Sequence, residues 1–379
     1  MDEKSVHSIY HRFITIQICI FLHMKKIRVE PNWRFTDSEG RQLTPQLFDL
    51  LKALKRSGKL TDAAKTIDVS YRHGWNLIKE WTDFFGTPLV DMKKGKGASL
   101  TMLGEKLLWA EERVQARLGP QLENLASELN LEIHKTLQKE QPVINIFASH
   151  GYAVALLPEW VDKLQVNLQY MPAEHAISAV INGECELAGF HLPRNLEDSE
   201  LYKRYKQLLS SSDLTVISFI TRSQGLIIQS GNPKNISSLK NLTRQDIKFI
   251  NRQQGSGTSE LLEEWLLNEQ IPTNKIKGYE TREFTHSAVA AYVASGMADV
   301  GLGVEPPARN FGLDFIALGK EHYLFVCRTE SLASQSLDSF IKEISNNAFA
   351  EAIIRLPGYN LDSPGKLIST TELFNSLTD

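Results

Sequence analysis

The sequence predicts an α/β protein in three parts: an N-terminal winged helix-turn-helix, a long linker helix, and a C-terminal bilobed α/β domain. Helical periodicity followed by a basic, glycine-rich hairpin between residues 44 and 101 indicates the first part. Leucines at helical spacing up to about residue 137 indicate the second, and alternating strand and helix patterns from residue 141 indicate the third. The 379 residues exceed what one hydrophobic core usually supports. We expect these parts at residues 24–101, 102–140 and 141–379, with residues 1–23 as a leader outside the fold.

The leader contains an apolar run, residues 13–22, that is too short to span a bilayer and has no small-residue cleavage site after it. Translation starting at Met24 explains the leader, and a weak signal peptide is the alternative. The cysteines Cys19, Cys185 and Cys327 form no CxxC pair and have no histidine at metal-ligand spacing. These observations predict a protein of the reducing cytoplasm, without structural zinc and without a place in the membrane.

Charge is distributed unevenly along the chain. Residues 41–101 contain eleven Lys and Arg against six Asp and Glu, whereas the whole chain has a formal net charge of −3. A basic module joined to an acidic one is typical of a nucleic-acid-binding protein with a separate sensing part.

Two helices are predicted at the start of the basic module. Thr44 and Pro45 form a helix start, and leucines recur at helical spacing until Gly58 provides a stop. A second, shorter helix follows over residues 61–67, where the neighbouring Ala63 and Ala64 permit close approach by the next helix.

A third helix is predicted to enter the DNA major groove. Ser70 can cap its start and Gly86 can end it. Its buried stripe is expected to consist of Trp75, Ile78, Trp81 and Phe85. The opposite face of such a helix contacts base edges and phosphates in helix-turn-helix proteins. The candidate DNA-binding residues here are Ser70, Tyr71, Arg72, His73, Asn76 and Lys79. A solvated helix face without DNA contact is the alternative.

A β-wing is predicted over residues 88–101. Two short apolar stretches flank a tip with three lysines and two glycines. Positive side chains at such a tip can reach the phosphates beside the groove. The wing lysines, Lys93, Lys94 and Lys96, are therefore further candidate DNA-binding residues.

The linker helix is expected to run from residue 102 to about residue 137. Its leucines recur at three-, four- and seven-residue steps between Glu and Arg side chains, which favours a dimer helix. Packing of this stripe on the same chain is the alternative. Gly119 and Pro120 predict a kink or a break.

The N-terminal motifs resemble a known family. In order they are the paired alanines, the Val-Ser-Tyr-Arg turn, Gly-Thr-Pro-Leu-Val at 86–90, the Lys/Gly wing, and Leu-Thr-x-x-Gly at 100–104. This order resembles the winged-helix domain of LysR-type regulators, and more closely that of molybdate-responsive, ModE-like regulators, over roughly residues 25–135. The resemblance implies a homodimer or tetramer that binds double-stranded DNA.

The C-terminal part predicts βαβ units and a parallel sheet. Strands are expected at residues 143–147, 166–171, 186–191 and 247–250, with helices at 152–164, 173–182, 259–267 and 286–294. Ligands of open sheets collect where strands end and helices begin. Three segments lie at such positions: 148–151, 252–258 and 285–287. Their backbone N–H groups, hydroxyls and one guanidinium could surround an oxyanion. A plain strand-to-helix turn with Ser256 or Thr258 as its cap is the alternative.

This part also resembles a known family. The motifs "NRQQGSGTSELLEEWL" and "THSAVAAYVASGMADVGLGVEPPA" are similar to the periplasmic-binding-protein-like domain of LysR-type regulators and of some proteins of molybdenum cofactor synthesis. Solute-binding proteins for tungstate and molybdate show a similar order. The resemblance implies the ligand-binding residues Ser149, Arg252, Ser256, Gly257 and Thr258, with His191, Arg222 and Glu305 as secondary positions. Arg252 in a surface ion pair and His191 as a satisfied strand-end histidine are the alternatives. His150 and Gly151 replace a more hydroxyl-rich loop, which points to a larger or different ligand.

Together these patterns predict a cytoplasmic, ligand-responsive transcriptional regulator that is not an enzyme and has no covalent cofactor. The resemblance implies molybdate or tungstate, or a related molybdenum cofactor species, as the effector. A molybdopterin-related enzyme and a transport solute-binding protein for an oxyanion are the alternatives.

Overall fold

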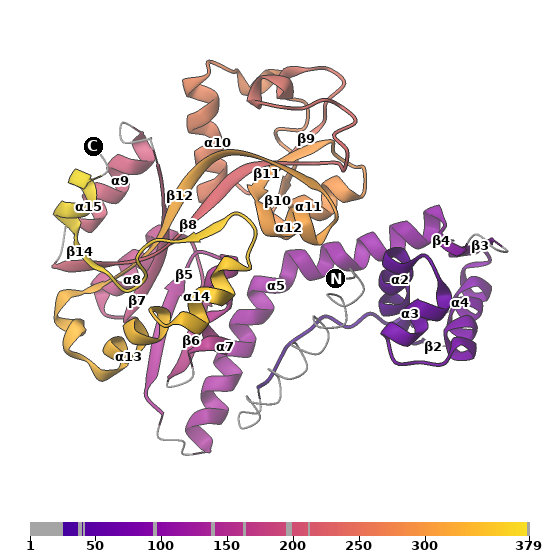
Figure 1. The fold of residues 1–379 in the computed structure, drawn as a ribbon, viewed down its shortest axis with the longest axis horizontal. Coiled ribbons are helices and arrows are strands. Elements are labelled where there is room, and N and C mark those ends of the chain that lie inside the picture. Colours follow the sequence, from indigo (N-terminus) through magenta and orange to yellow (C-terminus); the bar gives the residue numbers. More distant parts are fainter. Residues whose placement is uncertain are drawn as a thin grey trace, which may run out of the picture.

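The computed structural model describes residues 26–36, 40, 42–93, 97–137, 141–161, 164–194, 199–210 and 213–376. The expected leader and Cys19 lie outside the described residues. Figure 1 shows an N-terminal domain at one end of a long helix, α5, which runs along a larger α/β domain. The architecture is the one expected: a winged helix-turn-helix, a linker helix and a bilobed α/β domain. Among the described residues, none of the helices combines the length and the apolar composition that crossing a bilayer requires.

The N-terminal domain contains the expected three helices and wing. Its elements are β1 (Phe35–Thr36), β2 (Gln42–Leu43), α2 (Gln46–Ser57), α3 (Leu60–Thr66), α4 (Tyr71–Phe85), β3 (Val90–Lys93) and β4 (Gly97–Leu100). Gly58 and Gly86 end α2 and α4 in the left-handed conformation, with φ of 66° and 63°. Glycine adopts this conformation without the steric cost of a Cβ, which explains both helix ends. The strands β3 and β4 pair antiparallel, which confirms the hairpin.

The buried stripe of α4 differs from the expected one. Trp75 is 46% exposed, whereas Gly74, Leu77 and Trp81 are buried. A Cβ placed on Gly74 would contact the side chains of α3 at 3.5 Å, so α4 approaches α3 through this glycine. The prediction for Trp75 was therefore wrong, because the buried face of α4 begins at Gly74, one residue before Trp75.

Helix α5 (Met102–Thr136) continues through Pro120 without interruption. The helix changes direction about half-way along (Figure 1), so of the two predicted outcomes, a kink or a break, the structure shows the kink. Proline removes one backbone hydrogen bond and its ring clashes with the preceding turn, which accounts for a bend without a break. Thr101 caps the start of α5 by accepting a hydrogen bond from the backbone N–H of Gly104.

The C-terminal domain is built on one large mixed sheet. Its strands are β5 (Val143–Ala148), β6 (Gln165–Tyr170), β7 (Leu187–Pro193), β8 (Leu214–Ile228), β9 (Phe249–Arg252), β10 (Arg282–Glu283), β11 (Val300–Val304), β12 (Asp314–Arg328), β13 (Tyr359–Leu361) and β14 (Leu367–Ser369). The order is β10-β9-β11-β8-β12-β7-β5-β6, with β13 and β14 on β8. Only the two ends of this order are parallel, because β8 and β12 run antiparallel to each other, β8 to β11, and β12 to β7. The expectation of a parallel sheet is thus corrected.

The helices cover both ends of this sheet. They are α6 (Tyr152–Ala155), α7 (Leu157–Trp160), α8 (Ala173–Asn182), α9 (Glu200–Leu209), α10 (Gly257–Asn268), α11 (His286–Ala294), α12 (Glu305–Asn310), α13 (Gln335–Ile344), α14 (Asn347–Ile354) and α15 (Thr370–Ser376), with 3-10 turns Leu239–Thr243, Thr273–Lys275 and Thr329–Ala333. The single helix expected over 152–164 is two short helices, α6 and α7.

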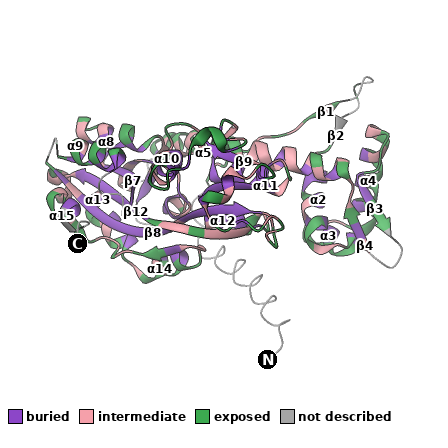
Figure 2. Ribbon diagram, turned by 90° about the horizontal axis from the view of Figure 1, so that it is seen from above, coloured by how far each residue is buried: buried purple, intermediate pink, exposed green. Residues whose placement is uncertain are grey.

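The long strands β8 and β12 join two lobes. The first lobe contains β5–β7, α6–α9 and α13–α15, and the second contains β9–β11 and α10–α12. Figure 2 shows β8 and β12 running side by side through the body of the domain. Their pairing is irregular between Ala317 and Gly319 and between Tyr323 and Leu324. Such bulges bend a strand locally, so the two lobes meet at a bent part of the sheet.

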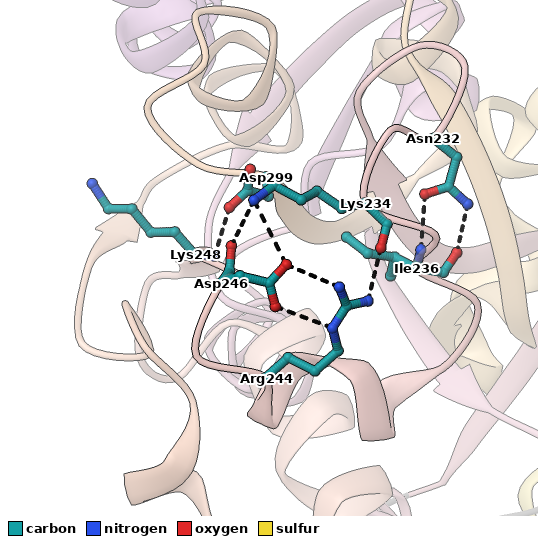
Figure 3. A network of polar contacts seen from close by, with 7 residues as sticks. All are labelled: Asn232, Lys234, Ile236, Arg244, Asp246, Lys248 and Asp299. Carbon is teal, nitrogen blue, oxygen red and sulfur yellow. Dashed lines mark hydrogen bonds and ion pairs between the residues drawn. The ribbon is translucent and has the colours of Figure 1, made fainter.

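The loop that leads into β9 is held by a polar network at the surface (Figure 3). Arg244 donates two hydrogen bonds to the Asp246 carboxylate and one to the backbone carbonyl of Lys234. Asn232 exchanges two hydrogen bonds with the backbone of Ile236. Exposed ion pairs contribute little to stability, but the carbonyl and amide bonds fix the path of the loop.

Candidate functional site

A cluster of polar side chains, buried except for the half-buried Ser149, lies between the two lobes. The first lobe contributes Ser149 after β5 and His191 on β7, and the second contributes Arg252 at the end of β9, Thr258 on α10 and His286 at the start of α11. The shared strands add Arg222 and Gln224 from β8 and Glu321 from β12. We call these eight residues the cleft cluster. The structure thus brings together side chains from segments that lie up to about 170 positions apart in the sequence.

Arg252 is buried and has no ion pair among the described residues. Its Nη2 donates a hydrogen bond to the backbone carbonyl of Phe284 at 3.1 Å, while Nε and Nη1 have no hydrogen-bond partner. Burial, together with the nearby Arg222 charge, lowers the pKa of Arg252 to about 10, so it is still charged at neutral pH. The alternative of a surface ion pair is therefore wrong, and two donors of a buried cation are free to bind an anion.

His191 is held by a chain of hydrogen bonds in the first lobe. The Tyr323 hydroxyl donates to the carbonyl of Ser149 at 2.6 Å, and the Ser149 hydroxyl donates to the Tyr323 oxygen at 3.2 Å. The Ser149 oxygen then accepts from Nδ1 of His191 at 3.3 Å. The other ring nitrogen, Nε2, is buried and has no hydrogen-bond partner in the described part of the chain, so His191 is only half satisfied.

The two lobes touch at Gly257. A Cβ placed on Gly257 would lie only 1.5 Å from Nε2 of His191, so glycine alone permits this approach. Two further contacts join the lobes: the hydroxyls of Tyr152 and Ser287 are 2.6 Å apart, and Arg204 pairs with Glu260 at 2.8 Å. The lobes are therefore closed over the cleft cluster.

A buried ion pair occupies the bent part of the shared strands. Arg222 Nε donates to Glu321 Oε1 at 2.5 Å, and Gln224 Nε2 donates to the same oxygen at 2.8 Å. Gln224 Nε2 also lies 3.4 Å from the Thr258 hydroxyl of the second lobe. These contacts link both strands to the start of α10. Gln224, Glu321 and Tyr323 were missed from the sequence, because β8 and β12 were not identified as strands.

Three histidines around the cluster are held neutral. Burial, and after it the charges of Arg252 and Arg222, lowers the pKa of His150 to about 4. Burial also lowers the pKa of His191, and it lowers the pKa of His286 well below its ordinary value. In both cases the two guanidinium groups contribute further. At His191 the Glu321 carboxylate acts in the opposite direction, but burial outweighs it.

Two expected ligand-binding residues have structural roles. The Ser256 hydroxyl donates to the Gln253 carbonyl and accepts from the backbone N–H of Ser259, which makes it the cap of α10. Glu305 pairs with Arg309 on its own helix at 2.7 Å. Within the described residues, no group of three or more His, Cys, Asp and Glu side chains is arranged to hold a metal ion. Cys185 and Cys327 are free and buried.

The candidate DNA surface is the outer face of α4. The side chains exposed there are Ser70, Tyr71, Arg72, His73, Asn76 and Lys79. The Ser70 hydroxyl also accepts from the backbone N–H of His73 and so caps the helix, as expected. Trp75, which sequence reasoning placed in the core, joins this face. Lys94 and Lys96 lie outside the described residues, and of Lys93 only the backbone is described.

The comparison with family models finds a match within the C-terminal domain. A family model described as the PBP superfamily domain matches residues 154–345. The chain belongs to the PBP superfamily. The matched range contains the second lobe, the shared strands and most of the first lobe, which agrees with the resemblance seen in the sequence.

Several curated relatives match parts of the chain. YvgK of Bacillus subtilis, an uncharacterized protein, is 33% identical over 205 residues, which are 54% of this chain and 65% of YvgK. The molybdenum-pterin-binding protein MopB of Rhodobacter capsulatus is 28% identical over 31% of this chain and 46% of MopB. The molybdenum transport protein ModE of Azotobacter vinelandii is 27% identical over 24% of this chain and 35% of ModE. The chain thus spans less than two thirds of each of these three relatives.

Solved structures of regulators match most of the chain at low similarity. OxyR of Corynebacterium glutamicum covers 83% of this chain and 95% of its own, with 14% identity and a TM-score of 0.42. The LysR family regulator CbnR covers 79% of this chain and 99% of its own, with 12% identity and a TM-score of 0.38.

Proposed function

We propose that this protein is a DNA-binding transcriptional regulator of the LysR type whose C-terminal domain senses a small anion. The observation that carries the proposal is the attachment of α5 to both lobes, on either side of Pro120. The same helix carries the winged helix-turn-helix at its start. A change in the angle between the lobes must therefore change the path of the helix that positions the DNA-binding face.

The first half of α5 is attached to the second lobe. Arg113 pairs with the fully buried Glu283 at 2.6 Å. The Arg117 guanidinium lies 4.4 Å from the centre of the Phe284 ring, and the Thr285 hydroxyl donates to the carbonyl of Ala116 at 2.6 Å. Phe284 is also the residue whose carbonyl accepts from Arg252. One backbone segment therefore contacts both the cleft cluster and the linker helix.

The second half of α5 is attached to the first lobe. The Asn124 side chain exchanges two hydrogen bonds with the backbone of Tyr170, at 2.7 and 3.1 Å. The Ser127 hydroxyl accepts from the backbone N–H of Leu168 and donates to Asn167. These bonds join α5 to the edge strand β6, so this half of the helix moves together with the first lobe.

An anion is the ligand that the cleft cluster favours. The cluster contains two buried guanidinium groups and one carboxylate, and its histidines are neutral. A small anion would compensate the excess positive charge and bind the free donors of Arg252. The names of MopB and ModE support molybdate, tungstate or a related molybdenum species as the anion. A ligand can shift DNA affinity only by the difference in its affinity for the two arrangements of the lobes.

We further propose that two chains pair through α5. Leu118, Leu125, Leu129, Ile133 and Leu137 are exposed on this helix at steps of four and seven residues. An exposed apolar stripe of this kind favours a helix-to-helix dimer, which would present two α4 helices to a two-fold DNA site.

The test uses the full chain with Arg252→Ala. We expect calorimetric binding of molybdate and tungstate to be lost, while the dimer and the ligand-free affinity for DNA remain. Arg244→Ala is the matched control, since Arg244 belongs to the surface network of Figure 3 and not to the cleft. Unchanged anion affinity in Arg252→Ala would remove the cleft cluster as the sensing site, and a wild-type chain that does not bind DNA would refute the regulator itself.

A further inference from the structure

The cleft cluster offers unpaired acceptors as well as unpaired donors. Arg252 Nε and Nη1 are buried donors without a partner among the described residues. Glu321 Oε2, Gln224 Oε1 and His191 Nε2 are equally buried and unpartnered, and each can be identified as an acceptor. Buried polar groups are almost always hydrogen-bonded, so both sets require partners.

The acceptor character of Gln224 follows from its orientation. Its Nε2 lies 2.8 Å from a carboxylate oxygen of Glu321, and only the amide N–H₂ can donate there. The remaining atom, Oε1, is therefore the carbonyl oxygen. Glu321 is also an acceptor. Burial by itself raises the pKa of its carboxyl, but the Arg222 charge, the neighbouring His191 and the hydrogen bonds from Gln224 and Arg222 together outweigh burial, and the pKa is below its ordinary value. Its carboxylate is thus ionised at neutral pH and has no proton to donate.

The tautomer of His191 follows from the chain of hydrogen bonds. Because the Ser149 hydroxyl donates its only proton to Tyr323, it can only accept from His191. Nδ1 therefore carries the proton of the neutral ring, and Nε2 has a lone pair.

These acceptors surround the start of α10. Glu321 is bonded to Gln224, and Gln224 lies 3.4 Å from the Thr258 hydroxyl. The neighbouring Gly257 lies against His191 Nε2. Arg252 is five positions earlier in the chain, and its charge acts on both His191 and Glu321. Donors and acceptors therefore face one small region.

We propose that the ligand is an anion that also carries hydrogen-bond donors, an O–H or N–H group next to its charged oxygens. A fully deprotonated tetraoxoanion such as molybdate only accepts, so its oxygens would meet the lone pairs of the three acceptors. A ligand of the proposed class pairs with Arg252 through its charged oxygens and donates to Gln224 or Glu321. This inference rests on the proposed anion sensing and specifies the chemistry of the ligand.

The test compares anions of equal shape in the full chain. Thermal shift and calorimetry are measured with molybdate, tungstate and sulfate, and with hydrogen phosphate and hydrogen arsenate, which keep a proton at neutral pH. A pterin phosphate, whose ring N–H groups can donate, forms a third arm. We expect tighter binding, by at least tenfold, in the second or third arm. Tighter binding of hydrogen phosphate or hydrogen arsenate would indicate an inorganic ligand, and tighter binding of the pterin phosphate would indicate an organic one.

Gln224→Met provides the second measurement. We expect it to weaken the donor-carrying anion at least tenfold while the affinity for molybdate stays equal or increases. A purely structural role of Gln224 would lower both affinities alike. Gln229→Met, at the end of the same strand, is the matched control and should change neither. Equal or tighter binding of molybdate than of every donor-carrying anion by the wild type overturns the inference but leaves anion sensing intact. No binding by any anion refutes the proposed function as well.

Discussion

The ion pair between Arg113 and Glu283 is the sharpest test of the attachment between α5 and the second lobe. Arg113→Met keeps the unbranched apolar part of the side chain and removes its charge. The Glu283 carboxylate is fully buried and would be left without a cation, whereas the Arg113 side chain is 31% exposed. The substitution therefore destabilises the contact mainly by leaving the buried Glu283 carboxylate without a cation.

The magnitude lies between two limits. Removing one partner of a fully buried pair costs about 3–5 kcal/mol, and exposed pairs contribute about 0–1 kcal/mol. Because only Glu283 is fully buried, we expect the local docking of α5 to lose about 2 kcal/mol. At about 1.4 kcal/mol for each factor of ten, this corresponds to a roughly 30-fold change in an opening equilibrium.

Hydrogen exchange of the backbone amides in the first half of α5 measures this opening directly. We expect exchange there to become about 30-fold faster in Arg113→Met. Glu283→Gln combined with Arg113→Met should restore part of the protection, because no buried charge remains. Lys342→Met is the control, since Lys342 forms an exposed pair with Asp338. If exchange in α5 stays within about threefold of the wild type, the ion pair does not hold the helix to the lobe.

Three further predictions follow from the wing, α4 and the cleft. Replacing the wing lysines together by Ala should weaken DNA binding and reduce the salt slope by up to about three; an unaltered slope in anisotropy titrations would exclude the wing from the contact surface. Trp75→Ala should weaken DNA binding and change the free energy of unfolding by less than about 0.5 kcal/mol, whereas Trp81→Ala should cost about 3–5 kcal/mol; denaturant unfolding of both variants separates a surface role from a core role. The free energy of unfolding should decrease as the pH falls from 6.5 to 4, because the unfolded chain binds protons that the native His150, with its pKa of about 4, does not bind. His150→Asn should flatten this slope, and an equal slope in both proteins would contradict the assignment.

The N-terminal domain could be predicted from the sequence almost element by element. Its helices end at glycines, and its wing has a clear pattern of apolar strands around a basic tip. The exception was Trp75, because the contact that decides the buried face is made by Gly74, which has no side chain to reveal it. Residue type alone cannot show that a large aromatic side chain stays outside.

The cleft could be predicted only in part. Segments at strand ends, such as Arg252 and Gly257, are recognisable because turns and caps leave a local pattern. Gln224 and Glu321 leave no such pattern, since they lie within long strands whose side chains alternate between the two faces of the sheet. Their role depends on the pairing of β8 with β12, which joins residues 97 positions apart. Pairing of this kind is a tertiary property that no local pattern encodes.

The position of Pro120 between the two attachments of α5 has a geometric consequence. Helix α5 is bonded to a different lobe on each side of Pro120. When one lobe rotates against the other, the helix therefore bends at this proline. The 18 residues from Pro120 back to Met102 span about 27 Å at 1.5 Å per residue. A rotation of about 10° at Pro120 would therefore displace the winged helix-turn-helix by about 5 Å. That travel exceeds the 3.4 Å rise of one nucleotide step in a DNA strand. A modest tightening around a bound molecule would thus be enough to take a paired assembly out of register with its operator.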